Sequence, residues 1–517
     1  MAVTIKRIVL NNFKKFKKLS VDFNDGKNII VGDNETGKST ILTAIDLVLS
    51  ASISKIERFG LENLFNRSAI DEFLSLETRK RTINELPHLS IDVYLNGITD
   101  QIFEGKNNLE KTYDIGIRLD ISPSDDQEEI INAIISGDNK TFPFEYYKIQ
   151  FFTFAGNSYH KFNKIFTNIL IDNSDIDGEY AKREYIKGVY YKTSQIQDRV
   201  RHQYNFRNTH DNFSENFLSE ISSGSISFKV PSNNKFSLEN QLQIYHENVN
   251  INNKGKGYQN LIKTKYALQK TQDTLNKLIL IEEPENHLSA TNMLKLLDEI
   301  SKYTDGQMFI TTHSNMITSR LGLENLFILS GIDSVSKLSD LKKDTSEFFI
   351  KAPNSNILNF VLSKKVILVE GHAEYILMEK FIKSTCGKMN NDVQIISVNG
   401  LSFKRYLEIA KITGGKTAVI TDNDGDYTNN VKEKYSDYNK YPNIKIFSPE
   451  DNAITTFEKA IYKCNKDLCE NKFGAERKDV VHYMLSNKSD CAFELLKSDE
   501  TLIVPEYIRN GITWISV

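Results

Sequence analysis

Two short acidic stretches in the last third of the sequence carry the side chains that bind divalent cations. "VEGHAE" follows an apolar run and places Glu370 and Glu374 on the same side of a helical turn. "TDNDGD" follows another apolar run, and an extended chain there would place Asp422 and Asp424 on one side. Two carboxylates about 4 Å apart repel each other by about 4 kcal/mol at an effective dielectric constant near 20. We therefore expect a cation between them, and oxygen ligands favour Mg²⁺, with Mn²⁺ or Ca²⁺ as substitutes, over zinc.

A phosphate-binding loop lies near the start of the chain. The stretch "GDNETGKST", residues 32–40, fits the pattern GxxxxGK[ST] and stands between a short apolar strand and an apolar-periodic helix. In such a loop the glycines let backbone N–H groups face phosphate, the lysine neutralises the β- and γ-phosphates, and the serine holds magnesium. The residues expected to contact ATP here are Gly32, Asn34, Gly37, Lys38, Ser39 and Thr40.

Two later apolar strands end in the other residues that ATP hydrolysis requires. In "KLILIEEPENHL" the strand is followed by Glu282, expected to support the magnesium ion, and by Glu283, expected to orient or deprotonate the attacking water. Glu285 is expected to be a surface acid. In "QMFITTHS" the strand ends at His313, which we expect to reach the γ-phosphate, although a single histidine is more often structural.

This order of elements resembles the ATP-binding-cassette ATPases, in the branch shared by repair and structural-maintenance proteins. The resemblance implies that two heads close face to face and that each supplies a glycine-rich signature to the other's ATP. Residues 253–260, "NKGKGYQN", before a helix expected to begin near Leu261, would supply Gly255 and Gly257. Lys256 stands where the family has a serine, and a point charge does not reproduce the geometry of a hydroxyl. We therefore expect slow hydrolysis, with ATP acting mainly as a conformational signal.

The length of 517 residues predicts about two to four folding units, and the alternation of apolar strands with helical segments predicts an α/β fold. Period-two patterns such as "HLSIDVYLNG" predict antiparallel strands in the first lobe. The strand and helix alternation after residue 363 predicts a parallel sheet with functional residues at its carboxyl edge. The predicted parts are an ATPase domain at 1–335, with an inserted helical, dimerising element at about 155–245, a polar linker at 336–362, and a second domain at 363–517.

The net charge of −3 argues against a broadly basic nucleic-acid-binding domain, so any such contact must be a local patch. The candidates are "NNFKKFKK", residues 11–18, and the interval from Lys182 to Arg207; an ordinary solvated surface is equally compatible with both. No apolar run approaches the roughly 18 residues that span a bilayer, and we expect a cytoplasmic protein. The four cysteines form no CxxC pair, which predicts reduced packing residues.

A strand that ends in glutamate followed by a strand that ends in DxD resembles a Toprim domain, a module of topoisomerases, primases and nucleases. A topoisomerase would need a much larger breakage domain, and a bacterial primase a zinc module for which the cysteines are wrongly spaced. A cassette ATPase followed by Toprim resembles the OLD (overcoming lysogenization defect) family nucleases, which include the A subunit of Gabija anti-phage systems and retron-associated effectors. The resemblance covers nearly the whole chain outside the inserted element and the linker.

The resemblance implies an ATP-regulated, metal-dependent DNA endonuclease of a defence system that uses two metal ions. It further implies that Thr456 and Glu458 of "ITTFEKAI" join the second metal position and that Lys488 of "SNKSDCAFEL" stabilises charge on the scissile phosphate. Asp426 is expected to be an outer or solvent-facing group. The implied partners are DNA, a second copy in a homodimer or higher oligomer, and a helicase-like or reverse-transcriptase/ncDNA component.

Two alternatives stay open at this point. The chain could be an ATP-driven DNA clamp or repair ATPase with a structural Toprim domain, or a partner-sensing ATPase that does no DNA chemistry. Taken alone, "DNDGD" is also typical of an acidic surface turn.

Overall fold

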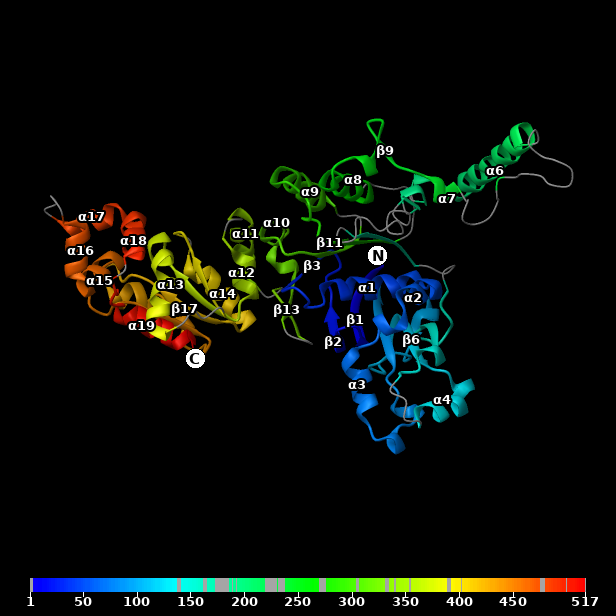
Figure 1. Ribbon diagram of the computed structural model, residues 1–517, viewed down its shortest axis with the longest axis horizontal. Helices are drawn as coiled ribbons and strands as arrows, with labels where there is room; N and C mark the ends of the chain where they lie inside the picture. Colours follow the sequence, from blue (N-terminus) through cyan, green and yellow to red (C-terminus); the bar gives the residue numbers. More distant parts are fainter. Residues whose placement is uncertain are drawn as a thin grey trace. The chain divides into compact units, whose positions relative to one another are not determined.

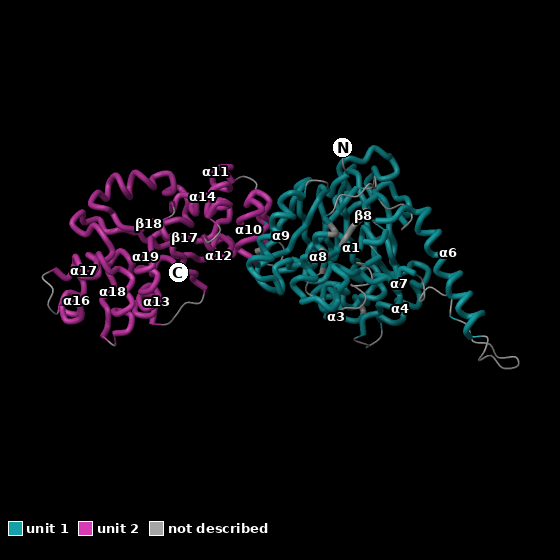
Figure 2. The backbone as a smooth tube through the Cα atoms, turned by 90° about the horizontal axis from the view of Figure 1, so that it is seen from above, with its two compact units in different colours: residues 1–313, 329–335 teal, residues 314–328, 336–517 magenta. Residues whose placement is uncertain are grey.

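In the computed structural model the chain forms two compact units, shown in different colours in Figure 2. The first unit comprises Met1–His313 and Leu329–Val335, and the second comprises Ser314–Ile328 and Ser336–Val517. The structure describes residues 3–516 except 137–140, 161–164, 173–185, 188, 192, 219–229, 231–237, 269–275, 304–305, 331–333, 339–340, 353–354, 388–391, 401, 475–478 and 499.

An antiparallel sheet opens the first unit, as the period-two patterns predicted (Figure 1). Its strand order is β2-β1-β4-β6-β5, with β7 also paired to β6. β1 and β2 form a hairpin in which Phe13 pairs with Phe16. The strands are β1 (Thr4–Phe13), β2 (Phe16–Asp22), β4 (Leu89–Asn96), β5 (Glu104–Gly105), β6 (Asp114–Pro123) and β7 (Tyr147–Thr153).

A second sheet of the first unit carries the ATP-type motifs. The strands β3 (Lys27–Gly32), β12 (Gln307–Thr311), β11 (Asn276–Glu282) and β8 (Phe166–Asp172) lie side by side and parallel, and β13 (Leu326–Ser330) and β14 (Ser334–Lys337) continue the order beyond β3. Helix α1 (Lys38–Ser50) contacts strands of both sheets and is buried along almost its whole length. The phosphate-binding loop is therefore held between two strand layers.

The sequence suggested a helical element at about residues 155–245. The interval also contains a strand, since β8 pairs along its full length with β11. Among its described residues are the helices α6 (Ile196–Phe213) and α7 (Leu238–Gln241) and the π-helical turn Ser214–Leu218. Lys182 and Arg183 of the predicted basic interval lie outside the described residues. The other helices and short strands of this unit are α2 (Ile53–Phe59), α3 (Arg67–Ser75), α4 (Glu128–Ile135), β9 (Tyr245–His246), β10 (Val249–Asn250), α8 (Lys256–Leu268) and α9 (Ala290–Lys302).

The second unit contains the predicted parallel sheet, in the order β16-β15-β17-β18. Apolar side chains of α13, α15, α18 and α19 pack with the sheet into one buried core, in which Cys469 and Cys491 are free thiols. The elements are β15 (Lys365–Val369), α13 (His372–Cys386), β16 (Val393–Ser397), α14 (Phe403–Thr413), β17 (Lys416–Ile420), β18 (Ile444–Phe447), α15 (Phe457–Cys464), α16 (Lys466–Phe473), α17 (Val480–Ser486), α18 (Lys488–Lys497) and α19 (Glu506–Ser516).

The segment 336–362, expected to be a polar linker, is packed structure. It contains α11 (Lys343–Lys351) and α12 (Ile357–Leu362), and α10 (Asn315–Arg320) contacts both helices. The rings of Phe349 and Phe360 stand edge-on to Tyr406 of α14, with centroids 5.2 and 5.3 Å away. These few apolar residues of a mostly polar segment bury enough surface to hold α11 and α12 in place. None of the helices in the described part of the chain combines the length and the apolar character needed to cross a bilayer.

One carboxylate is buried in the antiparallel sheet. Asp92 of β4 is 0% exposed, accepts a hydrogen bond from the backbone N–H of Leu109 at 2.5 Å and lies 3.7 Å from Nε of Arg118. Burial raises the pKa of Asp92 from 3.8 to about 6, although Arg118 opposes the shift. The folded chain therefore binds this proton more tightly than the unfolded chain, and ionisation of Asp92 lowers stability as the pH rises from about 4 to about 6.

We predict that Asp92→Asn removes this part of the pH dependence. Because a shift of about two pKa units corresponds to about 3 kcal/mol, the variant should gain up to that amount relative to the wild type between pH 4 and pH 7. Urea-unfolding midpoints at both pH values measure the change. An equal difference between variant and wild type at both pH values would contradict the prediction.

Candidate functional site

The phosphate-binding loop joins β3 to α1 in a conformation that requires glycine. Gly37 precedes α1 with a φ of 101°, in the left-handed region. A Cβ on Gly37 would lie 2.4 Å from Cζ of Phe16, and a Cβ on Gly32 would lie 2.4 Å from Oγ1 of Thr36. Neither position has room for a side chain, so both require glycine. With no side chain in the way, the backbone N–H groups of the loop can face phosphate.

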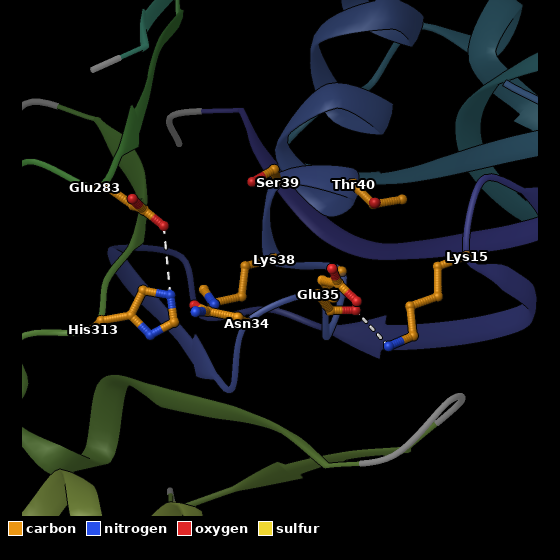
Figure 3. A pocket seen from close by; sticks show the side chains of 9 residues that line it. Lys15, Asn34, Glu35, Lys38, Ser39, Thr40, Glu283 and His313 are labelled. Atoms are coloured by element: carbon orange, nitrogen blue, oxygen red, sulfur yellow. Dashed lines mark hydrogen bonds and ion pairs between the residues drawn. The ribbon is translucent and has the colours of Figure 1, made fainter. Parts of the chain in front are cut away.

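The loop forms one wall of a pocket, and residues after β11 and β12 form the other (Figure 3). The ammonium group of Lys38 is buried and donates to the carbonyl oxygens of Gly32 and Asp33, both at 3.0 Å. Burial lowers the pKa of Lys38, and the surrounding acids, Glu283 first, oppose this. The lining residues are Lys15, Asn34, Glu35, Gly37, Lys38, Ser39, Thr40, Glu283 and His313.

The predicted general base and the predicted phosphate sensor face each other in this pocket. Oε1 of Glu283 lies 3.4 Å from Nε2 of His313, and Oε2 accepts a hydrogen bond of 2.9 Å from Asn286. Burial and the ammonium group of Lys38 lower the pKa of His313, which leaves the imidazole neutral at pH 7. Glu283 has a φ of 41°, a conformation uncommon outside functional sites for such a residue. Glu282 ends β11 directly before it.

Glu285 is not the surface acid that the sequence suggested. Its Oε1 accepts hydrogen bonds from the hydroxyl of Thr312 at 2.7 Å and from the backbone N–H of His313 at 2.6 Å. Burial raises the pKa of Glu285, and its Oε2 is buried without a hydrogen-bond partner. Glu285 therefore fixes the backbone that carries the histidine, a role that depends on a contact between two strand ends and has no local sequence signal.

The basic stretch at residues 11–18 contributes one lysine to this pocket. It forms the β1–β2 turn, where the ammonium group of Lys15 donates to the carbonyl oxygen of Glu35. Lys17 forms an ion pair of 2.6 Å with Glu72. The ammonium group of Lys14 lies 5.6 Å from the centre of the Phe59 ring, so three of the four lysines in this stretch are engaged. Lys15 lines the nucleotide pocket.

The glycine-rich stretch begins a helix earlier than expected. Helix α8 starts at Lys256 and not near Leu261, so Gly257 lies in its first turn. A Cβ on Gly257 would lie 2.1 Å from the carbonyl oxygen of His287, and this close packing by itself accounts for the glycine. Gly255 precedes the helix, and a Cβ there would meet nothing within 4 Å. Its open backbone suits contact with a ligand, and the contact with a second copy's ATP remains a prediction.

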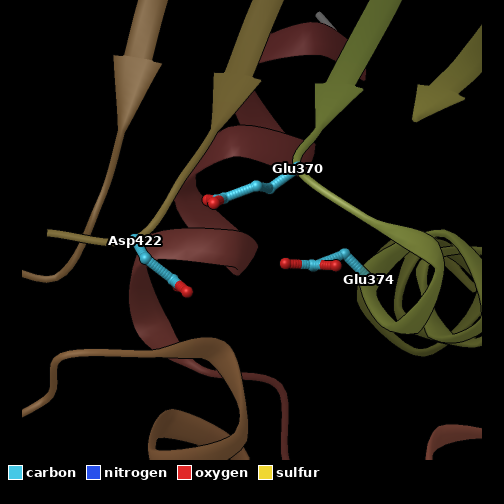
Figure 4. Close-up of side chains that lie close together, drawn as sticks. All are labelled: Glu370, Glu374 and Asp422. Atoms are coloured by element: carbon cyan, nitrogen blue, oxygen red, sulfur yellow. The ribbon is translucent and has the colours of Figure 1, made fainter. Parts of the chain in front are cut away.

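The acid cluster lies at the carboxyl edge of the parallel sheet in the second unit. Glu370 follows β15, Asp422 follows β17, and Glu374 extends from the first turn of α13 toward both (Figure 4). Oxygen atoms of the three carboxylates lie within 4.8 Å of one another. The backbone N–H of Gly371 holds Oε2 of Glu374 at 3.1 Å. The structure thus brings these three predicted residues together.

Burial and mutual repulsion raise the pKa of two acids in this cluster. Burial, then Glu370 and Glu374, raises the pKa of Asp422 to about 8, against the opposing hydrogen bond from the backbone N–H of Phe457. Burial, together with Glu370 and Glu458, also raises the pKa of Glu374. Such shifts are typical of functional sites and are the expected state of a cation site before the cation binds.

The elements implied by the family resemblance approach the same place. Glu458 is 4% exposed, and its Oε2 is buried without a hydrogen-bond partner, while its Oε1 lies 3.5 Å from the ammonium group of Lys488. Lys488 begins α18 and is half exposed. Thr456 caps α15 by accepting a hydrogen bond of 3.4 Å from the backbone N–H of Lys459. Its hydroxyl is thus engaged in the helix start.

Asp424 stands in the loop after β17 and not in the extended strand that the sequence predicted. β17 ends at Ile420, and Asp424 is exposed with a φ of 50°, so the loop turns away from the strand direction. Among the described acids, the close cluster contains Asp422 but not Asp424. Asp426 accepts hydrogen bonds from the backbone and the side chain of Asn429, which lower its pKa. It caps the next helical turn.

Two family models match the chain. The model of the AAA domain matches residues 7–351, and the model described as Overcoming lysogenization defect protein-like, TOPRIM domain, matches residues 361–424. The endonuclease GajA of Bacillus cereus is 23% identical over 460 residues, which are 81% of this chain and 74% of GajA. The chain belongs to the AAA-domain proteins and, through its Toprim domain, to the OLD family.

Other similarities are more local or weaker. The chromosome partition protein Smc of Methanocaldococcus jannaschii is 51% identical over 53 residues, which are 10% of this chain and 4% of Smc. An Smc head bound to the C-winged helix domain of ScpA aligns over 66% of this chain and 100% of its own, at 16% identity and a TM-score of 0.33. The C-terminal region of the Xanthomonas campestris OLD protein aligns over 30% and 92%, at 17% identity and a TM-score of 0.23.

The family matches confirm the predicted fold class, an α/β chain with an ABC-type P-loop ATPase head followed by a Toprim domain with a parallel sheet. One residue near the Toprim acids escaped the sequence analysis of this OLD-family chain. The partly buried Tyr507, in the first turn of α19, lies within electrostatic reach of Asp422, Glu374 and Glu458, and burial and these acids raise its pKa. It stands 85 residues after Asp422 in sequence, and no motif marks it.

We predict that Glu283→Gln slows ATP hydrolysis at least about 100-fold and leaves ATP binding intact, because the amide keeps the shape of the side chain but cannot accept a proton. Steady-state phosphate release and fluorescent-nucleotide binding measure the two effects. Glu347→Gln, an exposed acid on α11, is the matched control. Unchanged turnover in Glu283→Gln would show that another group activates the water.

We predict that Mn²⁺ binding to the Toprim acids releases close to one proton at pH 7. Asp422, with a pKa of about 8, is mostly protonated there and must ionise to become a ligand, so the apparent affinity should rise with pH up to about 8 and then level off. Calorimetry in buffers of different ionisation enthalpy counts the proton. Asp422→Asn should abolish the release, whereas Asp467→Asn, which changes an exposed acid on α16, should not. Heat that is independent of the buffer would contradict the prediction.

Proposed function

We propose that this OLD-family chain is an ATP-regulated, divalent-metal-dependent DNA endonuclease that acts in defence against phage. The observation that carries the proposal is the cluster of Glu370, Glu374 and Asp422, whose oxygen atoms lie within 4.8 Å of one another. Like charges at this spacing are unfavourable unless protons or a cation neutralise them. The similarity to the endonuclease GajA supports phosphodiester cleavage as the use of that cation.

The donor set fits a hard divalent cation. All donors are carboxylate oxygens, which suit Mg²⁺ first and Mn²⁺ or Ca²⁺ as substitutes. The buried Oε2 of Glu458 without a partner is a further oxygen that a cation would satisfy. Glu370, Glu374 and Asp422 would hold one ion, and Glu458, with Thr456 and Asp424, would contribute to a second position.

The proposed reaction is hydrolysis of a DNA phosphodiester. Two bound Mg²⁺ ions would supply an activated water and stabilise charge on the leaving oxygen. Lys488 has an ammonium group that is half exposed and anchored 3.5 Å from Glu458, so it can turn toward a phosphate and stabilise its developing charge. Glu458 thereby both holds the lysine and donates an oxygen to the cation site.

The proposed regulation places ATP in the first unit. Lys38 would exchange its two carbonyl partners for the β- and γ-phosphates, and Ser39 with Glu282 would hold the accompanying Mg²⁺. Gly255, with an open backbone at the start of α8, would reach the ATP of a second copy, so we propose a homodimer or higher oligomer. Lys256 beside it makes rapid turnover unfavourable, so ATP would act mainly as a signal. We further propose a cytoplasmic location and a helicase-like or reverse-transcriptase/ncDNA partner.

We predict that purified protein nicks or linearises supercoiled plasmid in Mg²⁺ or Mn²⁺ and loses this activity in EDTA. Glu370→Gln and Asp422→Asn should each lower the cutting rate at least about 100-fold, because each removes a charged ligand. Nucleotide binding should be unchanged, since the ATP pocket lies in the other unit. Asp467→Asn is the matched control for charge.

Three results would separate the proposal from its alternatives. Cutting that persists in Glu370→Gln and Asp422→Asn would place the activity elsewhere or in a contaminant. DNA binding that depends on ATP, without cutting in either metal, would favour an ATP-driven clamp. ATP hydrolysis without DNA binding or cutting would favour a partner-sensing ATPase.

A further inference from the structure

We infer that a patch of lysines beside the Toprim acids binds the sugar–phosphate backbone of double-stranded DNA. This inference rests on the proposed function, since it names the surface that presents the substrate to that site. We call it the lysine patch, and it consists of Lys404 and Lys411 on α14, Lys432 in the π-helical turn Thr428–Glu433, and Lys434 and Lys440 in the segment that follows.

Two buried tyrosines connect the lysine patch to the acid cluster. Tyr435 is 3% exposed and lies within electrostatic reach of Glu370, and burial followed by that carboxylate raises the pKa of Tyr435 to about 12. Its ring centroid lies 6.4 Å from that of Tyr438. The hydroxyl of Tyr438 donates to the carbonyl oxygen of Lys404 at 3.3 Å, and the ammonium group of Lys411 lies 4.3 Å from the centre of its ring. The patch therefore borders the proposed catalytic site.

The π-helical turn is fixed to the loop that carries Asp422. Asp426 accepts two hydrogen bonds from Asn429, at 3.1 Å from the backbone and 2.6 Å from the side chain. The side chain of Asn430 donates to the carbonyl oxygen of Asn423 at 3.0 Å. Asn423, which is 0% exposed, in turn donates to the carbonyl oxygens of Pro449 and Asp451. A phosphate bound by Lys432 or Lys434 would thus be positioned relative to Asp422, and π-helical turns are frequent at such functional sites.

The charges of this surface are available for a ligand. The side chains of Lys404, Lys432, Lys434 and Lys440 are exposed, and none of them forms an ion pair with a residue that the structure describes. Glu408, on the same helix as Lys404 and Lys411, is engaged by Thr345 and by Lys342 at 3.1 Å. Glu433 and Asp437 are the other acids in these segments, which carry five lysines of the patch. In a chain with a net charge of −3, this is a local positive surface.

Lysine side chains on this surface suit phosphate contacts better than base recognition. Each ammonium group is a flexible point charge, which neutralises a phosphate but does not read a base edge as a bidentate group does. We therefore infer binding that is independent of sequence and strongly dependent on salt. The lysines are spread over three segments between residues 404 and 440, so the sequence shows no continuous run of positive charge.

The test measures DNA binding separately from cutting. All proteins in this test are full length and carry Asp422→Asn. A fluorescein-labelled duplex of mixed sequence is titrated with the Lys432→Glu/Lys434→Glu protein in Mg²⁺ at several salt concentrations. Lys364→Glu/Lys383→Glu makes the same charge change at the amino end of β15 and in the last turn of α13, away from the carboxyl edge. We expect at least about tenfold weaker binding for the first variant, and a slope of log K against log[salt] reduced by about 2. The control should change affinity less than about twofold by the same reasoning.

Equal affinities and equal salt slopes for the two double variants would overturn the inference, as would the absence of DNA binding by the background protein. If Lys432→Glu/Lys434→Glu does not fold, judged by circular dichroism and thermal unfolding, Lys404→Glu/Lys440→Glu applies the same test with two other lysines of the patch.

A plasmid-cutting assay in the Asp422 wild-type background distinguishes this inference from the proposed function. The lysine variant should raise KM for DNA and leave kcat within about twofold, because the lysines hold substrate and do not touch the reacting atoms. Salt-dependent binding through the patch, without cutting by the wild type, would refute the nuclease and leave the patch standing. Cutting by the wild type, with an unchanged KM in the lysine variant, would refute the patch and leave the nuclease standing.

Discussion

Repulsion among carboxylates at one edge of a parallel sheet is the constraint on which the second unit depends. β15 and β17 are adjacent and pair in the register Val369 with Ile420, so the residues that follow them emerge at the same edge. α13 adds Glu374 from its first turn, and α15 adds Glu458 close by. The fold brings these acids together against their repulsion, and a proton on Asp422, whose pKa is raised to about 8, relieves part of the cost. Burial and the neighbouring acids also raise the pKa of Glu374. A cation neutralises the same charge without a proton, which makes metal capture the natural use of the arrangement.

In the first unit too, the functional residues follow the carboxyl ends of parallel strands, but the expected ligand is an anion. β3, β12 and β11 are parallel neighbours, and the phosphate-binding loop, His313 and Glu283 follow their carboxyl ends. Here the edge presents backbone N–H groups and a buried ammonium group to an anion. One chain therefore carries an anion site and a cation site, both built from strand ends, and the proposed function assigns the first to a nucleotide signal and the second to cleavage of a phosphodiester.

The sequence predicted residues that directly follow apolar strands, because strand ends are readable from local pattern. Glu283, His313, Glu370 and Asp422 were predicted in this way, and Lys38 from the GxxxxGK[ST] pattern. The structure places Lys38, Glu283 and His313 in one pocket and Glu370 and Asp422 in one cluster. The failures depend on backbone direction or on distant contacts. Asp424 lies in a loop with a left-handed backbone conformation, which an alternating sequence pattern cannot reveal. Helix α8 starts five residues before the expected position, where Gly257 packs closely on the backbone of His287. Glu285, Tyr507 and the lysine patch depend on contacts between residues that are distant in sequence. The segment expected to be a linker folds because a few aromatic residues in a polar sequence pack together.

Anomalous diffraction from crystals grown in Mn²⁺ tests the central claim most directly, because it locates the ion independently of any activity. The account predicts a strong anomalous peak coordinated by carboxylate oxygens of Glu370, Glu374 and Asp422, lost in Asp422→Asn crystals prepared in the same way. A map without a peak among these oxygens, with the side chains still facing one another, would show that protons alone stabilise the cluster and would contradict the assignment of a metal-dependent nuclease.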